Sequence, residues 1–303
     1  MKVWMNGKFV PQDQAVVPIL SHGFSRGSAI FEVLDLSTGD QGLSLFRLDA
    51  HVDRFFRSAE IMQVSLPLSA EQLSRAVVET AAESGVTEGV AKFFAYYAGT
   101  DVSLMPAAGK QINIAVFCYD LAETIGKTHE ELAAPARAGI SALRKVNAGG
   151  SAVQAKVAGQ YVPAYLAVNE IRRKGYDEVI MLDQDGFIAE SGTMSVFFVK
   201  DGRLLTSTLR NALPGITRDS VIAIARDAGI EVIETDITGG QITEFDEAMF
   251  TSTVVRVKPI LSIDESAMPG TCPGPVTSRV TDALNDVYAG RNSNYAQWLT
   301  PVR

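Results

Sequence analysis

Two residues in the second half of the chain are of types that could carry chemistry. Lys156 begins the segment Lys156-Val157-Ala158-Gly159-Gln160-Tyr161, and Glu190 follows the apolar run Phe187-Ile188-Ala189. A lysine amine can act as a nucleophile and as a general acid–base group. A carboxylate at the end of an apolar strand has a high desolvation cost unless a cation pairs with it. Most lysines are solvated surface residues, so the rest of the sequence must decide whether Lys156 is functional.

Other short motifs occur in order along nearly the whole chain. They are Trp4-Met5-Asn6-Gly7, Phe31-Glu32, Phe46-Arg47-Leu48-Asp49-Ala50-His51-Val52-Asp53-Arg54, Leu213-Pro214-Gly215-Ile216-Thr217-Arg218, Asp246-Glu247-Ala248, Thr251-Ser252-Thr253, Gly274-Pro275-Val276-Thr277 and Trp298-Leu299-Thr300-Pro301-Val302. Each motif is weak alone, but all of them in one order, with Lys156 and Glu190 among them, form a specific pattern. The chain thereby resembles the class IV aminotransferases, which depend on pyridoxal 5′-phosphate (PLP), and within them the branched-chain and D-amino-acid aminotransferases.

The resemblance implies a two-domain class IV aminotransferase fold of the α+β or α/β class. It would combine a small α/β domain with a larger β-rich domain with flanking helices, and PLP would lie between them. A chain of 303 residues, 47% of them hydrophobic, is large enough for two modest cores. We expect a small domain at 1–121, a linker at 122–134 and a large PLP-binding domain at 135–303.

Local signals in the first half predict alternating strands and helices. Asn6-Gly7 between apolar flanks predicts a hairpin over 3–10. Ser69 followed by Glu71 predicts the start of a helix that Gly85 ends. The remaining predicted elements are strands over 30–36, 43–46, 90–97 and 112–119 and a helix over 48–62.

The second half alternates in the same way. Strands over 179–182 and 187–189 flank the turn Asp183-Gln184-Asp185-Gly186, and strands over 196–200 and 203–206 flank Asp201-Gly202. The other predicted elements are helices over 161–174 and 219–228, each stopped by a glycine, and a strand over 230–233.

The resemblance gives the reactive residues their roles. Lys156 would be the catalytic residue: it holds PLP covalently and, once released, moves a proton at the substrate α-carbon. Glu190 would face the pyridine nitrogen and keep it protonated, and Tyr161 would contact the ring oxygen. From the residues alone, Glu190 could instead reach solvent at a strand end, and Tyr161 could simply pack at a helix start.

A second group of residues is expected around the cofactor phosphate. Gly215-Ile216-Thr217 precedes a predicted helix, and the free N–H groups of a helix N-terminus bind phosphate. Arg54 would add a charge-assisted contact. Ser252 and Thr253 would offer hydroxyl and N–H groups. Taken singly, these residues also fit an ordinary helix cap, a solvated arginine beside Asp53 and plain strand residues.

The substrate side departs from the branched-chain pattern. That group carries a tyrosine where this chain has Arg26, an arginine where it has Asp35, and a Tyr-x-Arg segment near Ala91-Lys92-Phe93. Arg26 and Lys92 could bind a substrate α-carboxylate, or both could be surface charges.

The handedness of the substrate depends on where its carboxylate binds. A clamp formed by Arg26 and Lys92 would favour D-amino acids, whereas binding at the Thr253-Val254 backbone would favour L-branched ones. The Trp298-Leu299 ending is similar to the branched-chain group and favours the L-branched interpretation. The expected substrate residues are Arg26, Phe31, Lys92, Thr253 and Val254.

Composition restricts the possible partners. The net charge is −8 and no basic run occurs, so nucleic acid is not an expected partner. No apolar run approaches the roughly 18 residues of a membrane helix, and the first residues lack the apolar core of a signal peptide. The two cysteines and three histidines show no metal-ligand spacing, so no metal is expected. These features favour a cytoplasmic protein with small-molecule partners, and the resemblance implies a homodimer.

We therefore predict a PLP-dependent transaminase, branched-chain-like, that exchanges nitrogen between an α-amino acid and a 2-oxo acid by a ping-pong mechanism. The alternatives are a D-amino-acid aminotransferase, a PLP lyase of the aminodeoxychorismate type, and a PLP-binding homologue without turnover.

Overall fold

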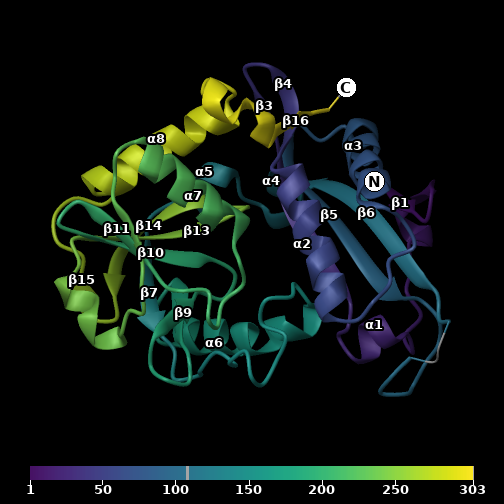
Figure 1. Ribbon diagram of the computed structural model, residues 1–303, viewed down its shortest axis with the longest axis horizontal. Helices are drawn as coiled ribbons and strands as arrows, with labels where there is room; N and C mark the ends of the chain where they lie inside the picture. The colour runs from purple at the N-terminus through teal and green to yellow at the C-terminus, as the bar shows by residue number, and fades with distance from the viewer. Residues whose placement is uncertain (107–108, 303) are drawn as a thin grey trace. The chain divides into compact units, whose positions relative to one another are not determined.

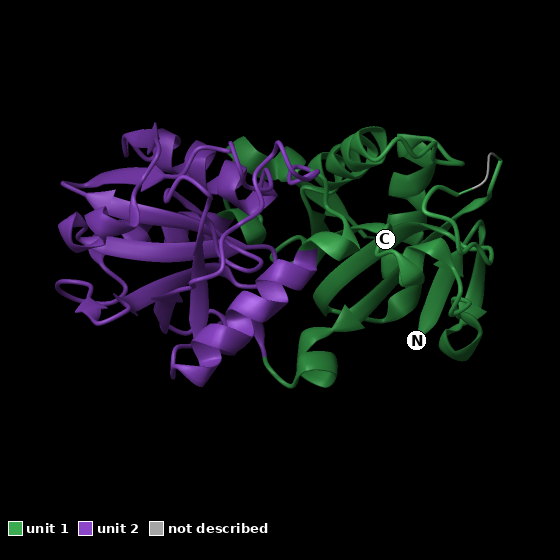
Figure 2. Cartoon of the chain, turned by 90° about the horizontal axis from the view of Figure 1, so that it is seen from below, with its two compact units in different colours: residues 1–127, 155–160, 287–303 green, residues 128–154, 161–286 purple. Residues whose placement is uncertain are grey.

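The computed structural model describes residues 1–106 and 109–302 (Figure 1) and consists of two compact units (Figure 2). Unit 1 contains Met1–Lys127, Ala155–Gln160 and Val287–Arg303, and unit 2 contains Thr128–Gln154 and Tyr161–Asp286. Lys156 therefore belongs to unit 1, while Glu190 belongs to unit 2. The sequence-based division had assigned both later segments of unit 1 to the second domain. Arg303, the last residue of that predicted domain, lies outside the described residues.

Unit 1 is built on a seven-stranded antiparallel sheet. In spatial order its strands are β16 (Leu299–Pro301), β4 (Gly42–Phe46), β3 (Ile30–Gly39), β5 (Glu88–Tyr97), β6 (Ile112–Asp120), β1 (Lys2–Met5) and β2 (Lys8–Pro11). The predicted hairpin is confirmed: Trp4 pairs with Phe9, and both turn residues, Asn6 and Gly7, have positive φ.

Helices α2 and α3 pack against this sheet. The predicted start of α3 is confirmed, because the Ser69 hydroxyl accepts a hydrogen bond from the Gln72 N–H (3.2 Å), and Gly85 ends the helix with φ of 73°. The side chains of Phe55 and Leu73 are fully buried beneath these helices. The helical segments of unit 1 are η1 (Gln12–Gln14), α1 (His22–Ser25), α2 (Leu48–Ile61), α3 (Ala70–Ser84), α4 (Leu121–Ile125), η2 (Ala158–Gln160) and η4 (Ser293–Trp298).

Unit 2 contains a mixed nine-stranded sheet. Its strands run in the order β12 (Val232–Glu234), β11 (Arg203–Thr206), β10 (Ser195–Lys200), β13 (Glu247–Ser252), β14 (Arg256–Ile263), β7 (Ala136–Ile140), β8 (Glu178–Leu182) and β9 (Ile188–Glu190), and β15 (Ser266–Ala267) pairs with β14. The pairs β11–β12, β14–β7 and β7–β8 are parallel, and the predicted β8–β9 hairpin is confirmed as antiparallel.

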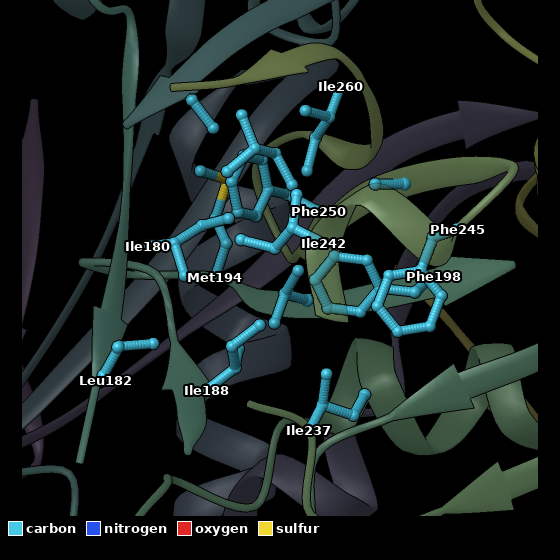
Figure 3. Packing of buried hydrophobic residues seen from close by; sticks show 14 of the residues in the cluster. Ile180, Leu182, Ile188, Met194, Phe198, Ile237, Ile242, Phe245, Phe250 and Ile260 are labelled. Carbon is cyan, nitrogen blue, oxygen red and sulfur yellow. The ribbon is translucent and has the colours of Figure 1, made fainter. Parts of the chain in front are cut away.

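The core of unit 2 is an apolar cluster between its strands (Figure 3). Phe198 of β10 and Phe250 of β13 are fully buried, and Phe198 stacks on Phe245 with ring centroids 4.5 Å apart. The helical segments of unit 2 are α5 (His129–Leu132), α6 (Tyr161–Arg173), α7 (Ile216–Asp227) and η3 (Gly239–Glu244), and α8 (Pro275–Tyr288) begins in it.

One predicted element needs correction. Helix α7 begins at Ile216 rather than at 219, because Gly215 is its N-cap and accepts the first helical hydrogen bond from the Asp219 N–H (2.9 Å). Helices α4 and α5 occupy most of the predicted linker 122–134, and each has a side-chain N-cap. None of the helices within 1–106 and 109–302 is long and apolar enough to cross a membrane.

Candidate active site

Lys156 is fixed through its backbone to the start of β3. The Phe31 N–H donates to the Lys156 carbonyl (3.0 Å), and the Lys156 N–H donates to the Ser58 hydroxyl (3.0 Å). The next residue, Val157, forms an antiparallel bridge with Ile30. The Lys156 ammonium lies 4.9 Å from the centroid of the Phe31 ring. This half-buried amine therefore has a defined position beside an aromatic ring.

Lys92 lies against the same ring. Its ammonium is 5.2 Å from the Phe31 centroid and 4.9 Å from the Phe94 centroid. Phe31 pairs with Phe94 across β3 and β5, and their rings stack at 5.6 Å. Burial lowers the pKa of Lys92. The structure thus brings together Lys156, Phe31 and Lys92, three of the residues that the sequence singled out.

Arg26 occupies a different setting in unit 1. It follows α1 as its C-cap, is exposed, and donates to the Val102 carbonyl (2.9 Å). This contact connects Arg26 to the loop after β5. The role of Arg26 in substrate binding stays a prediction.

Arg54, on α2, is held by a carboxylate that the sequence analysis quoted only within a motif. Its Nε and Nη2 atoms donate to the two oxygens of Glu32, each at 2.7 Å. His51 Nδ1 lies 2.8 Å from the same carboxylate. Burial would raise the pKa of Glu32, but the Arg54 charge and the hydrogen bonds from Arg54 and His51 more than offset it, and that pKa falls to about 2. Arg54 is therefore a cation of fixed direction, with its Nε and Nη2 donors engaged.

Replacing Glu32 by glutamine is expected to lower the free energy of unfolding by about 3–5 kcal/mol, because it leaves the Arg54 charge buried without its counter-ion. Urea unfolding at pH 7 measures this loss. The matched control is Glu83→Gln, whose pair with Lys2 is 52% and 60% exposed and should contribute about 0–1 kcal/mol. Equal losses in the two variants would contradict the structural role of Glu32.

The same pair predicts a pH dependence of stability. The pKa of Glu32 is lowered from 4.5 to about 2, so its contribution is complete above about pH 4.5 and is lost as the pH falls towards 2. A lowering of the Glu32 pKa by this amount corresponds to about 3 kcal/mol in the free energy of unfolding. The difference in the free energy of unfolding between wild type and Glu32→Gln should therefore become smaller below pH 4.5. A gap that stays constant down to pH 3 would count against this assignment.

In unit 2, Glu190 ends β9 and is 8% exposed. Its Oε1 pairs with the Lys145 ammonium, and its Oε2 accepts a hydrogen bond from the Leu213 N–H (3.4 Å). Next to it, the hydroxyl of Ser191 is buried and has no hydrogen-bond partner among the described residues. The apolar run before Glu190 predicts a paired carboxylate here, but no sequence pattern marks Lys145 as its partner.

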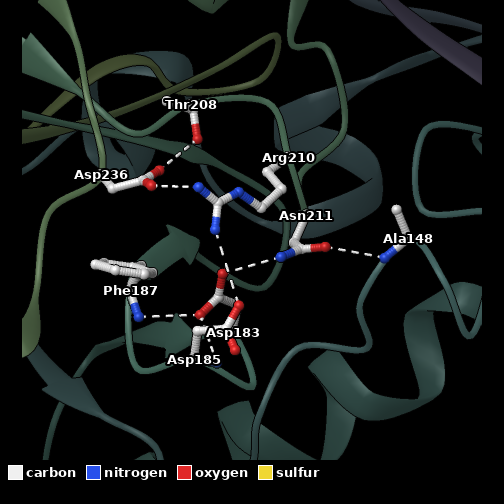
Figure 4. Close-up of polar contacts among 8 residues, drawn as sticks. All are labelled: Ala148, Asp183, Asp185, Phe187, Thr208, Arg210, Asn211 and Asp236. Carbon is white, nitrogen blue, oxygen red and sulfur yellow. Dashed lines mark hydrogen bonds and ion pairs between the residues drawn. The ribbon is translucent and has the colours of Figure 1, made fainter.

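The loops that carry Lys145 and Leu213 are connected by polar contacts (Figure 4). The Asn211 side chain donates to Asp183 (2.9 Å) and accepts from the Ala148 N–H (2.9 Å). Asp183, which is buried, also accepts from the Phe187 N–H (3.0 Å). A buried carboxylate with this set of donors gives the two loops a fixed geometry around Glu190.

The first turn of α7 offers donors for an anion. Gly215 caps the helix without a side-chain hydrogen bond, and Ile216 and Thr217 behind it are buried. A Cβ at Gly215 would lie 2.7 Å from the Ser195 hydroxyl, so a side chain there would displace its neighbour. A helix N-terminus without a capping side chain can offer its N–H groups to a phosphate, and this role of Gly215, Ile216 and Thr217 stays a prediction.

The other predicted residues of unit 2 lie at element ends. Tyr161 is the first residue of α6, and Ser252 ends β13, where it pairs with Arg256. Thr253 and Val254 form the turn to β14, and the Val254 carbonyl lies 2.7 Å from His129 Nδ1. The roles of Tyr161, Ser252, Thr253 and Val254 in cofactor and substrate binding stay predictions.

Known proteins share both the sequence pattern and the fold. The family described as Amino-transferase class IV matches residues 29–263. The branched-chain-amino-acid aminotransferase of Pseudomonas aeruginosa is 29% identical over 301 residues, covering 99% of this chain and 97% of that protein. The branched-chain aminotransferase from Thermoproteus uzoniensis with norvaline superposes with a TM-score of 0.93 at 33% identity, covering 100% and 99% of the two chains. The T.th. branched-chain amino acid aminotransferase, complexed with N-(5′-phosphopyridoxyl)-L-glutamate, gives 0.92 at 32% identity, covering 100% and 98%.

Proposed function

We propose that this chain, which belongs to the class IV aminotransferases, exchanges the amino group of a branched-chain L-amino acid with a 2-oxo acid. Membership itself makes the protein a PLP-dependent transaminase. The observation that carries the choice of substrate is the aromatic surface beside Lys156, where Phe31 and Phe94 stack. Such a surface suits an aliphatic side chain better than a charged one.

The residues present fit the cofactor. The first turn of α7, which has no side-chain cap, would offer N–H groups for the phosphate, and Arg54 would supply a cation for it. Glu190 would meet the pyridine nitrogen and Tyr161 the ring oxygen, while Ser252 and Thr253 would add polar contacts. PLP, when bound, supplies an electron sink for the substrate α-carbon.

The chain itself supplies the proton transfer and the positioning. The Lys156 amine would hold the cofactor and then take the proton from the substrate α-carbon. Its backbone bonds to Phe31 and Ser58 fix the part of the chain from which the amine extends. The first substrate leaves as a 2-oxo acid before a second 2-oxo acid takes up the nitrogen, which is a ping-pong scheme.

A second candidate is a D-amino-acid aminotransferase, and Lys92 favours it. A cation against the aromatic surface beside Lys156 could bind a substrate carboxylate. A substrate carboxylate bound by Lys92, with or without Arg26, would present one face of the α-carbon to Lys156. A carboxylate bound at the Thr253-Val254 backbone would present the opposite face.

One set of measurements separates the two candidates: kcat/KM for L-leucine, L-valine, D-alanine and D-glutamate with 2-oxoglutarate, in wild type, Lys92→Ala and Arg26→Ala. For the proposed function, the L-amino acids have the higher kcat/KM. Both variants keep kcat/KM within about twofold of wild type, a difference near 0.4 kcal/mol. For the second candidate, the D-donors lead and Lys92→Ala loses about tenfold or more, because a charge-assisted contact contributes about 1.5–3 kcal/mol.

Dependence on the 2-oxo acid also tests the reaction class. A lyase of the aminodeoxychorismate type would form product without an acceptor, whereas a transaminase requires one. The proposal includes a homodimer, which the family resemblance implies, and a cytoplasmic location, which the composition favours. Sedimentation of the purified protein tests the first.

A further inference from the structure

The ion pair between Lys145 and Glu190 is enclosed. The two side chains are 16% and 10% exposed, and the ammonium contacts one carboxylate oxygen directly. The other oxygen accepts from the Leu213 N–H (3.4 Å). In a buried pair each charge depends on its partner, because little water is available to replace it.

The position of Lys145 is set by the same strands that carry Glu190. The Lys145 N–H donates to the Leu182 carbonyl of β8 (2.8 Å), and its own carbonyl accepts from the Gln184 side chain (3.2 Å). Met181, the residue before Leu182, pairs with Glu190 across β8 and β9. Lys145 is therefore fixed relative to the carboxylate that it contacts.

The Leu213 side of the carboxylate is fixed as well. Asn211 connects the Leu213 loop to Asp183 and to the Ala148 N–H, so both groups that contact Glu190 are attached to one polar network (Figure 4). Asp183 itself directly follows Leu182, to which Lys145 is bonded. Glu190 thus has little freedom to turn.

We propose that Lys145 is a positioning residue, which holds the Glu190 carboxylate through this ion pair and directs its remaining lone pairs to the cofactor nitrogen. This inference rests on the proposed function, in which that nitrogen meets Glu190. A carboxylate has about four lone-pair sites, so the contacts with Lys145 and Leu213 leave acceptor capacity for a third partner. Without the ammonium, one oxygen of the Glu190 carboxylate loses its partner, and the carboxylate can turn away from the ring nitrogen.

The test is to titrate PLP into the full-length chain freed of cofactor and to record its Kd and the absorption spectrum of the bound form. Lys145→Met should raise the Kd by about tenfold or more and change the spectrum, since a charge-assisted contact of about 1.5–3 kcal/mol is lost. Lys145→Arg, which keeps the charge, should restore the Kd to within about threefold. Lys200→Met removes a lysine from the half-exposed pair with Glu244 and should change neither quantity.

Combination with Glu190→Gln shows whether Lys145 acts through Glu190. In that background Lys145→Met should change the Kd by less than about threefold, since the charge it serves is gone. The inference is wrong if Lys145→Met has the same effect in both backgrounds, or no effect in the wild type. If Glu190→Gln alone changes neither Kd nor spectrum, the proposed position of the cofactor nitrogen is wrong. Urea unfolding checks each variant, and Lys145→Gln replaces a variant that does not fold.

Discussion

Lys156→Ala is expected to abolish steady-state transamination and to prevent covalent attachment of the cofactor. Removing the central group of a catalytic unit typically lowers kcat by roughly four to six orders of magnitude. The structure gives a reason to expect little damage to the fold. The contacts that fix this segment, to Phe31, Ser58 and through the Val157 bridge, are made by the backbone or by neighbouring residues. The measurements are kcat and the mass of the protein after borohydride treatment with PLP.

The control for this variant is Lys174→Ala. Lys174 is exposed on the surface of unit 2, where it pairs with Glu170, and its loss should leave kcat and covalent attachment unchanged. Wild-type turnover in Lys156→Ala, or a cofactor mass that persists after reduction, would show that another residue is the anchor.

Glu190→Gln is expected to slow the half-reaction by about 10²–10³-fold, or roughly 2.7–4 kcal/mol in the barrier, as for the loss of one preorganised electrostatic contact. Glutamine keeps the shape and can still accept a hydrogen bond from the Leu213 N–H, but it has no charge with which to hold a protonated ring nitrogen. Single-turnover spectroscopy with an excess of amino donor measures the rate constant.

The matched control is Glu244→Gln, which removes a carboxylate from the half-exposed pair with Lys200. It should leave the half-reaction unchanged. An unchanged rate constant in Glu190→Gln itself would mean that the ring nitrogen is not held by this residue.

Strong local signals predicted several elements of unit 1. The Asn6-Gly7 hairpin and the Ser69 cap have a mechanism in the residues themselves, and the structure contains both. By contrast, β13 was missed. Residues Glu247–Thr251 of β13 are all buried, so no alternation of polar and apolar residues marks that strand.

The partners of the candidate site residues were harder to predict than the residues themselves. Glu32 lies in the predicted strand 30–36, where a charge within apolar neighbours was a usable signal, but Arg54 as its partner follows from packing α2 on the sheet. The pair of Lys145 with Glu190 depends on how a loop folds back along β8, which no local pattern encodes. The sequence could therefore name candidate site residues but not the side chains that hold them in place.

The chain returns to unit 1 twice after leaving it, so unit 1 is assembled from segments that lie far apart in the sequence. Residues Ala155–Gln160 are joined at both ends to unit 2, yet they bond to β3, and β16 at the chain end completes the sheet beside β4. A fragment ending at residue 127 would lack both the lysine segment and an edge strand. Unit 1 can be completed only after residues up to Pro301 have been synthesised, so its last pairings close very long loops, and such non-local pairing is typical of slow folding.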